Sequence, residues 1–275
     1  MKLSEIIDWK TESIYTFDSW KDWNITTVMV WVHGNELAWP QILVKLIKKI
    51  DIKFWKVFFI FANLKALEQW VRQVEKNMNR CFVKWNKSGT YEELRAREIM
   101  KFLDQSDYLL DVHNTINEQN SIPFLISEHD EIWKFFNVRK IVSWFDELHP
   151  WWSDSYMNSI WKVWLCLESW SIYDKNSEII AENWILNFLK YTWNVDWEAE
   201  RYSSQEFIKF DYLYKNKTLN FKFTKEFKDF EKIKKWQIIW YDWDLIIKSD
   251  RDWFIIFPYI PRNIWDEVFC LWRKY

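Results

Sequence analysis

The 275-residue sequence predicts an α/β fold, a mixed sheet with helices on both faces, followed by a small all-β domain. Two observations lead to this prediction. Up to about residue 204, apolar β-branched runs alternate with segments of helical periodicity, a pattern typical of a sheet covered on both faces. Beyond that point, short alternating segments separated by turn residues show no strong helix. We therefore divide the chain into a larger domain, 1–204, and a β domain, 205–275.

The elements of the larger domain follow from the spacing of their apolar residues. TTVMVWV, at 26–32, is apolar and β-branched, as in a buried strand. The next segment repeats leucine and isoleucine at helical spacing from Leu37 to Ile50. By the same criteria we expect strands at 26–32, 56–63, 108–115, 122–127 and 162–169, and helices at 37–50, 64–70, 91–103 and 178–192.

The strands of the β domain are expected from short runs of alternating apolar and polar residues. These runs are EFIKFDYLY, TLNFKFT, WQIIWYDWDLIIKS and DWFIIFPYI. The lysine-rich stretch 222–235 also contains acidic residues, so we interpret it as a solvated face and not as a binding patch.

Charge and composition exclude several classes of protein. The net charge of −2 and the pI of about 6.2 argue against nucleic-acid binding through bulk positive charge. No apolar run approaches the ~18 residues that span a bilayer, and the first residues do not resemble a secretory signal. The three cysteines, Cys81, Cys166 and Cys270, are too far apart for a disulfide framework or a zinc cluster. We expect a cytoplasmic protein without nucleic-acid or membrane partners, and the composition indicates no oligomeric state.

Tryptophan and glycine occur in abnormal numbers, 24 and 2. Average glycine usage of about 7% would give roughly 19 glycines, which chains use for turns with positive φ and for helix ends. Many tryptophans occupy places that suit a small residue, among them Trp184, Trp193 and the hairpin-like 240–243. We hypothesise that most of them are glycines encoded by UGA, a codon that means stop, Trp or Gly in different genetic codes. An aromatic-rich carbohydrate-binding protein would explain the excess of tryptophan but not the missing glycine.

Three residues form a possible metal site. His33 and Glu36 stand three apart where a predicted strand runs into a helix, so both can reach one ion. His113 ends another predicted strand, and the ends of parallel strands meet at one sheet edge, where ligands bind. Two His and one Glu with an open position are a usual catalytic zinc arrangement. A His-x-x-Glu pair alone is common, however, and most instances bind nothing.

Other residues could support chemistry beside such an ion. Asp111 lies on the same strand face as His113 and could orient its imidazole. Glu168 ends an apolar strand, where a carboxylate can take a proton from an attacking water, although a solvated strand end is the plainer interpretation. Guanidinium groups such as those of Arg72 and Arg80 suit carboxylates and oxyanions, and alone they would be ordinary surface residues.

A family resemblance connects these residues. With Trp31 and Trp39 read as glycine, residues 28–40 become VMVGVHGNELAGP, which resembles the opening metal motif of the succinylglutamate desuccinylase/aspartoacylase family of zinc amidohydrolases. Further segments resemble that family in its order: NMNRCF (77–82), YEELRAREI (91–99), DVHNT (111–115), VWLCLESWS (163–171, with both tryptophans as glycine) and the β-rich tail. The tryptophans fall where the family has glycine.

The resemblance implies a zinc-carboxypeptidase-like catalytic domain followed by a β domain, and one Zn²⁺ per chain. It also implies a role for each candidate residue. His33, Glu36 and His113 would be the metal ligands, and Asp111 would support one of them. Glu168 would be the general base, and Arg72 would polarise the scissile carbonyl. Asn79, Arg80 and Asn114 would bind the substrate.

One departure limits the choice of substrate. In aspartoacylases an arginine about ten residues before the catalytic glutamate grips the substrate carboxylate. Here Asn158 lies near that place, and no arginine occurs between Arg139 and Arg201. The resemblance therefore supports the hydrolytic chemistry but assigns neither N-acetylaspartate nor succinylglutamate as the substrate.

The sequence leads to zinc-dependent hydrolysis of the amide bond of an N-acyl amino acid or a similar small amide. One alternative is a zinc carboxypeptidase acting on peptides, which shares this type of ligand pattern. Another is a non-catalytic module that binds a metal or a ligand. Such a module would need neither the base Glu168 nor the oxyanion donor Arg72, which favours the enzyme.

Overall fold

The computed structural model describes most of the chain. The described residues are 13–20, 23–36, 40–85, 89–115, 122–128, 131–143, 149–171, 177–196 and 198–274. The position of Trp39, which we interpreted as a glycine, lies outside these residues.

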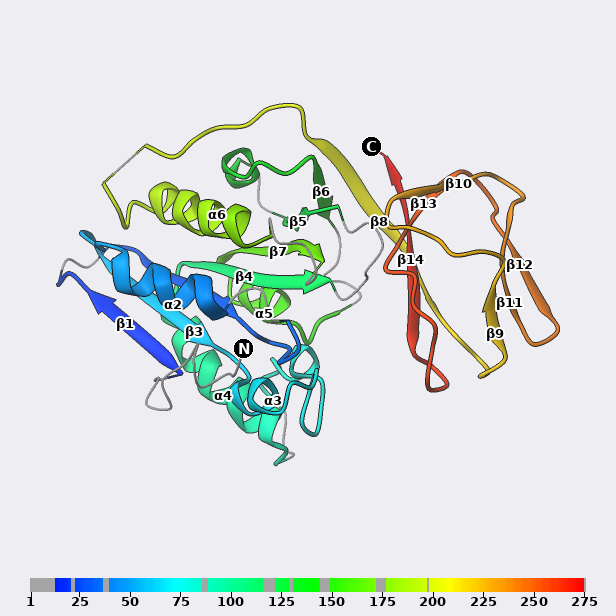
Figure 1. The fold of residues 1–275 in the computed structure, drawn as a ribbon, viewed down its shortest axis with the longest axis horizontal. Helices are drawn as coiled ribbons and strands as arrows, with labels where there is room; N and C mark the ends of the chain where they lie inside the picture. Colours follow the sequence, from blue (N-terminus) through cyan, green and yellow to red (C-terminus); the bar gives the residue numbers. More distant parts are fainter. Residues whose placement is uncertain are drawn as a thin grey trace.

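Within the described residues, eleven strands form one mixed sheet in the order β1-β3-β2-β4-β7-β5-β6-β8-β14-β13-β10 (Figure 1). β2, β3, β4 and β7 run parallel to one another, whereas β1 and β5 are antiparallel to their neighbours β3 and β7. The parallel strands are the apolar runs that the sequence predicted, as expected for strands buried on both faces. The strands of this part are β1 (Ile14–Asp18), β2 (Ile25–Val30), β3 (Lys56–Phe61), β4 (Tyr108–Thr115), β5 (Phe124–Ile126), β6 (Lys140–Ser143) and β7 (Val163–Ser171).

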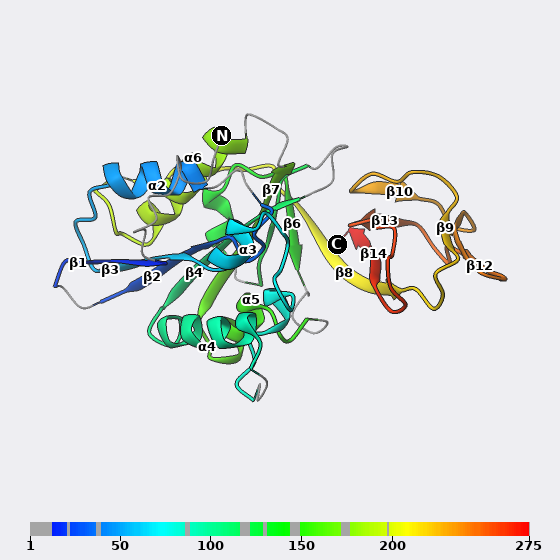
Figure 2. The ribbon, with the colours of Figure 1, turned by 60° about the horizontal axis from the view of Figure 1, so that its bottom comes forward.

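Helices cover both faces of this sheet (Figure 2). Alternate residues of β2 enter opposite cores, because successive side chains of a strand point to opposite faces. Val28 joins the core under α2 and α6 with Leu43 and Ile185, and Met29 joins the core on the other side with Ile99 of α4. The helices are α2 (Pro40–Lys49), α3 (Leu64–Glu68), α4 (Tyr91–Leu103), α5 (Ser153–Ser159) and α6 (Ser177–Tyr191), with 3₁₀ turns η1 (Met78–Arg80) and η2 (Ile132–Phe135). The predicted α/β arrangement is confirmed.

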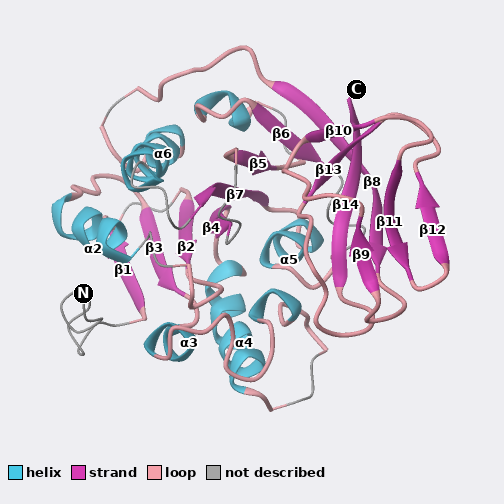
Figure 3. Cartoon of the chain, turned by 45° about the vertical axis from the view of Figure 1, so that its right-hand side comes forward, coloured by secondary structure: helices cyan, strands magenta, loops and turns pink. Residues whose placement is uncertain are grey.

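The C-terminal part is made of β-strands (Figure 3). Its first strand, β8, pairs with β6 on one side and β14 on the other, so the main sheet continues into this part. A second sheet has the order β12-β11-β9, and Ile233, Trp240 and Phe269 lie in the core of this part. The strands are β8 (Glu206–Lys215), β9 (Phe221–Phe223), β10 (Glu231–Ile233), β11 (Ile238–Asp242), β12 (Leu245–Lys248), β13 (Trp253–Ile256) and β14 (Glu267–Lys274). None of the helices that the structure describes has the length and apolar character to cross a bilayer.

Several short elements have no clear signal in the sequence. β10 lies in the lysine-rich stretch that we interpreted as a solvated face. Its Lys232 is exposed as expected, but Ile233 is fully buried. α5 has the polar sequence SDSYMNS, yet Tyr156 and Met157 are buried against the sheet. A segment of three to seven residues is too short for its periodicity to identify it.

Tryptophan occupies left-handed backbone at many positions. Among the described residues, thirteen that are not glycine have positive φ, and nine of these are tryptophans. Trp31 has φ 62° inside the metal motif, and Trp243 has φ 58° in the turn between β11 and β12. A side chain on Cβ is strained in this region, whereas glycine is not. The distribution is the one expected for glycine.

Candidate metal centre and active site

His33 and Glu36 lie in the turn that follows β2. The Glu36 amide donates a hydrogen bond to the His33 carbonyl oxygen at 3.3 Å, which closes the turn. Gly34 packs directly on the backbone of α3: a Cβ at this position would lie 2.1 Å from the carbonyl carbon of Ala66. Only glycine fits there, so the sequence His-Gly-Asn-Glu sets both side chains on one side of a tight turn.

His113 comes to the same place from the end of β4, the strand next to β2. Ligand atoms of the three residues lie within 4.8 Å of one another. His33 Nδ1 is 2.6 Å from Glu36 Oε1, and His113 Nδ1 is 3.4 Å from Glu36 Oε2. All three are buried, with at most 4% of their surface exposed. The structure thus brings together the three residues that the sequence suggested as metal ligands.

Neighbouring side chains orient both imidazoles. Asn77 Oδ1 accepts a hydrogen bond from the Asn79 amide at 3.0 Å, and His33 Nε2 lies 3.0 Å from the same oxygen. Since this oxygen is an acceptor, His33 carries its proton on Nε2 and directs the Nδ1 lone pair at Glu36. Asp111 Oδ2 lies 3.3 Å from His113 Nε2, which leaves Nδ1 of that ring facing Glu36 as well. Carboxylates and amides commonly fix metal-binding imidazoles in this way.

The charges of the cluster suit a divalent cation. Burial, with the nearby Arg72 cation, lowers the pKa of His33 to about 4, so its imidazole is neutral and can donate a lone pair. Burial opposes a charge on Glu36, but His33 and His113 outweigh it and hold the pKa of that carboxyl below its usual value. A neutral ring nitrogen and a carboxylate oxygen 2.6 Å apart both present electron pairs, which a cation between them would stabilise. Two imidazoles and one carboxylate are a donor set that zinc prefers, so the residues fit this metal.

Glu168 lies beside the ligand cluster on β7. It is the residue paired with His113 in the register of β4 and β7, so the two occupy neighbouring places on adjacent strands. Its side chain is partly exposed, but the surrounding protein removes enough water to raise the pKa of the carboxyl to about 7. Glu36 also raises this pKa, whereas His113 and Arg72 oppose the shift. A carboxyl with this pKa can exchange a proton near neutral pH.

Arg72 lies in the loop after α3, near enough to His33 and Glu168 to affect their ionisation. Its carbonyl oxygen accepts a hydrogen bond from the Gly34 amide at 3.3 Å, which ties this loop to the His33 turn. The side chain is exposed and forms no ion pair with any residue that the structure describes. Its guanidinium is therefore available to a substrate.

The residues implied in substrate binding have different surroundings. Asn79 is buried, and its Oδ1 has no hydrogen-bond partner among the described residues. Arg80 Nη2 donates to Glu267 Oε2 at 2.5 Å, and Nη1 donates to the Asn79 carbonyl oxygen at 2.9 Å. Asn114 Nδ2 donates to Ser169 Oγ at 2.7 Å, so its amide links β4 to β7 beside the ligand cluster.

Three residues at or near this site had no signal of their own in the sequence. Asn77 fixes the His33 tautomer, as described above. The buried carboxylate of Glu92 on α4 accepts hydrogen bonds from the backbone amides of residues 74–76 and so holds the loop between Arg72 and Asn77. Glu267 reaches Arg80 from β14. All three lie inside segments that resemble the family, but their roles depend on tertiary contacts that the sequence alone does not reveal.

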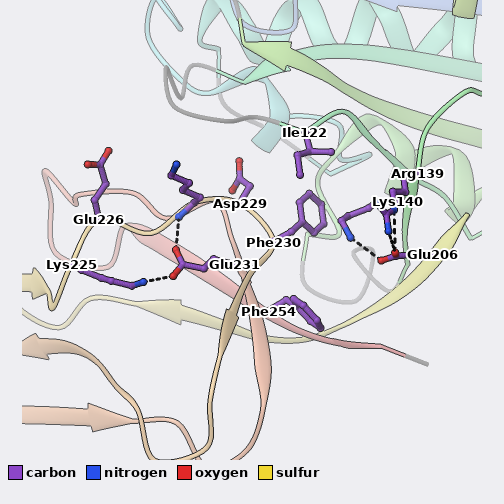
Figure 4. Close-up of a pocket in the computed structure, with 11 residues that line it drawn as sticks. Ile122, Arg139, Lys140, Glu206, Lys225, Glu226, Asp229, Phe230, Glu231 and Phe254 are labelled. Atoms are coloured by element: carbon purple, nitrogen blue, oxygen red, sulfur yellow. Dashed lines mark hydrogen bonds and ion pairs between the residues drawn. The ribbon is translucent and has the colours of Figure 1, made fainter.

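A cavity of about 720 Å³ lies away from these residues (Figure 4). It is lined by residues at the starts of β6 and β8, by the segment 225–231 that leads into β10, and by Ile122 and Phe254, and none of the three candidate ligands contributes to it. Five of its eight charged side chains form ion pairs with one another: Glu206 accepts from Arg139 at 2.8 Å and from Lys140 at 2.9 Å, and Lys225 pairs with Glu231. We therefore place the chemistry at the strand-end cluster and not here.

Replacing His113 with alanine should weaken metal binding strongly, because it removes one of three protein ligands. Zinc content after dialysis, measured by atomic absorption, should fall well below one equivalent. His149→Ala is the matched control, since His149 is also buried but lies outside the ligand cluster. This control should keep its zinc. Near-stoichiometric zinc in the His113 variant would contradict the assignment.

Comparison with known proteins supports a single family. Residues 26–148, which contain all three candidate ligands, match the family model of the succinylglutamate desuccinylase/aspartoacylase catalytic domain. A succinylglutamate desuccinylase of Pseudoalteromonas atlantica is 33% identical over 126 residues, 36% of this chain and 35% of that protein. A probable aspartoacylase of a Nostoc species is 30% identical over 123 residues, 38% of this chain and 42% of that protein. The chain thus matches less than half the length of these curated relatives.

Solved structures share the fold over nearly the whole chain. A succinylglutamate desuccinylase from Vibrio cholerae superposes with a TM-score of 0.74 at 16% identity, covering 95% of this chain and 85% of that one. The ectoine utilization protein EutE (DoeB) from Ruegeria pomeroyi has a TM-score of 0.73 at 16% identity, covering 94% and 88%. The sequence match over residues 26–148 is thus to the succinylglutamate desuccinylase/aspartoacylase family, and the solved structures show that nearly the whole chain shares the fold of proteins with these names.

Proposed function

We propose that the protein is a zinc-dependent hydrolase that cleaves the amide bond of an N-acyl amino acid. The observation that carries the proposal is the buried His33, Glu36 and His113 cluster, with Glu168 at the neighbouring position of the next strand. The curated relatives in the same family, a succinylglutamate desuccinylase and a probable aspartoacylase, support this class of substrate.

Zinc and Glu168 would carry out different parts of the hydrolysis. When bound, zinc supplies a Lewis acid that polarises the scissile carbonyl and makes water a better nucleophile at neutral pH. Glu168 accepts the proton of the attacking water and can return it to the leaving amine, because its pKa of about 7 allows both states. The amide C–N bond breaks, and the products are a carboxylic acid and a free amino acid.

Arg72 would stabilise the negative charge that develops on the carbonyl oxygen. It remains charged throughout the reaction, and its exposed guanidinium stands near both His33 and Glu168. Asn79, next to Arg80, offers a buried amide for the acidic end of the substrate.

Hydrolysis of a substrate panel tests the proposal. The panel contains N-acetyl and N-succinyl derivatives of several amino acids and, for the carboxypeptidase alternative, short peptides with free C-termini. Zinc-loaded protein should release free amino acids from N-acyl amino acids and leave the peptides intact. Cleavage of peptides alone would indicate the carboxypeptidase, and no hydrolysis of any panel member would favour a binding module.

Arg72→Ala should lower kcat by about 10²–10³-fold with zinc retained, the usual effect of removing one oxyanion donor. The reason is that Arg72 contributes to the transition state and not to the metal site. Steady-state kinetics and zinc content measured on the same preparation check this. Arg251→Ala, which removes an exposed arginine of the β domain, is the control and should behave like the unmodified protein. Unchanged kcat in the Arg72 variant would exclude the assigned role.

A further inference from the structure

The carboxylate of Glu267, in the β domain, contacts the guanidinium of Arg80. Its Oε2 accepts from Arg80 Nη2 at 2.5 Å, and Lys215 Nζ lies 3.6 Å from its Oε1. Arg80 follows directly after Asn79, and Asn77 in the same segment contacts His33. The pair therefore lies where the resemblance locates the acidic end of the substrate. Each partner keeps about a quarter of its side chain exposed, so a small molecule can reach it.

Two other cations lie close to this pair. Arg72 is near enough to act on the charge of Arg80, but we assign its guanidinium to the carbonyl oxygen of the scissile amide, and Lys215 faces Glu267 itself. The sequence has no arginine between Arg139 and Arg201 to hold a further carboxylate. A planar guanidinium presents a limited set of donors in a fixed fork, and on Arg80 both terminal nitrogens already have a protein partner. The remaining donors can hold one more carboxylate but not two.

We propose that Glu267 makes the site selective for N-acyl amino acids with a single carboxylate. Its own carboxylate occupies the face of Arg80 that a second substrate carboxylate would need, and it repels that carboxylate by like charge. This selectivity rests on the proposed function. It assigns Glu267 as a positioning and specificity-determining residue, supplied by the β domain to a site on the larger domain.

Binding of the product amino acids tests the selectivity without requiring turnover. Calorimetric titration of the zinc-loaded protein with alanine and with aspartate should show aspartate bound no more tightly than alanine. Glu267→Gln keeps the shape but removes the charge. It should raise the affinity for aspartate relative to that for alanine by about tenfold, the effect of roughly one ion pair. With N-acetylaspartate and N-acetylalanine as substrates, the same shift should appear in the ratio of KM values.

Controls separate this effect from general changes of charge. Glu226→Gln removes a negative charge from an exposed position of the same domain and should leave both ratios unchanged. Glu267→Asp keeps the charge and should keep the preference for alanine. Tighter binding of aspartate by the unmodified protein, or an unchanged ratio in Glu267→Gln, would overturn the proposal. A protein with the expected binding ratios that hydrolyses no panel member would instead refute the proposed function.

A different observation concerns how three helices end. α3, α5 and α6 are each followed by a cap residue and then by Trp70, Trp161 and Trp193, with φ of 57°, 61° and 59°. In each case the tryptophan amide bonds the carbonyl three residues back, and the next amide bonds the carbonyl five residues back, at 2.8–3.1 Å. These two hydrogen bonds with a left-handed residue define the Schellman motif, whose left-handed position is usually glycine.

The tryptophan rings gain little at these positions. Trp161 is 94% exposed, Trp193 69% and Trp70 45%, so packing does not compensate for the strained backbone. Glycine would adopt the same conformation without strain. We infer that the protein made in its own cells has glycine at 70, 161 and 193, through a UGA codon that its ribosomes translate as glycine.

Two measurements test this inference. The gene should have UGA at all three positions, and a UGG codon at any of them would overturn the inference for that position. Peptide mass spectrometry of the protein isolated from its own cells should show glycine residues there. Tryptophan masses in those peptides would contradict the inference whatever the codons are.

Discussion

Glu168→Gln should leave zinc bound at about one equivalent and lower turnover by about 10²–10⁴-fold. The amide keeps the shape of the side chain but cannot accept the proton of the attacking water. The metal should remain because the three candidate ligands, His33, Glu36 and His113, are unchanged. Zinc analysis and single-turnover hydrolysis of an N-acyl amino acid, on the same preparation, measure both effects.

The matched control is Glu226→Gln, which makes the same chemical change at an exposed position of the β domain. Its turnover and zinc content should equal those of the unmodified protein. If Glu168→Gln instead lost its zinc and recovered activity when metal was added back, Glu168 would be a ligand and not the base.

Replacing Trp70, Trp161 and Trp193 with glycine should stabilise the chain that contains all 24 tryptophans. A left-handed conformation costs a residue with a Cβ roughly 1–2 kcal/mol, and glycine offsets about 0.4–1 kcal/mol of the gain at each site through its freedom in the unfolded chain. The three changes together should therefore raise the free energy of unfolding by about 1–4 kcal/mol. This is large beside the ~5–15 kcal/mol of a typical domain. Urea denaturation of the two chains measures the difference.

Trp23→Gly is the control for this experiment. Trp23 is 87% exposed, like the three others, but it is not among the residues with positive φ. Glycine there should give no stabilisation, because it only adds freedom to the unfolded chain. Equal stabilisation at Trp23 would show that loss of an exposed ring, and not relief of the backbone, is responsible.

The sequence predicts those parts of the site that lie where parallel strands end at one edge of the sheet. β2 and β4 are recognisable as apolar runs. Because they are neighbouring parallel strands, His113 at the end of β4 lies beside the turn after β2 that contains His33 and Glu36. Glu168 follows by the same reasoning, since β7 is the next strand. Of the tryptophans that the sequence analysis named as suited to a small residue, Trp193 and Trp243 have positive φ, whereas Trp184 and Trp240 lie within α6 and β11 without it.

Other parts depend on contacts that sequence spacing does not reveal. Glu92 lies on a helix that was predicted as charged and amphipathic. The sequence of that helix does not show that the carboxylate of Glu92 is buried and holds a loop, while other charged side chains of the helix are exposed. Glu267 reaches Arg80 across 187 positions of the chain. The short strands β6 and β10 are completed by pairing with distant strands, and their own residues carry too little periodicity to predict them.

The dependence of hydrolysis on zinc tests the central claim most directly. Protein treated with a chelator and dialysed should lose hydrolysis of the best N-acyl amino acid of the panel. Adding one equivalent of Zn²⁺ should restore it to the unmodified protein but not to His113→Ala. Full turnover by the metal-free protein, or full restoration of the His113 variant by one equivalent, would contradict a zinc site built from His33, Glu36 and His113.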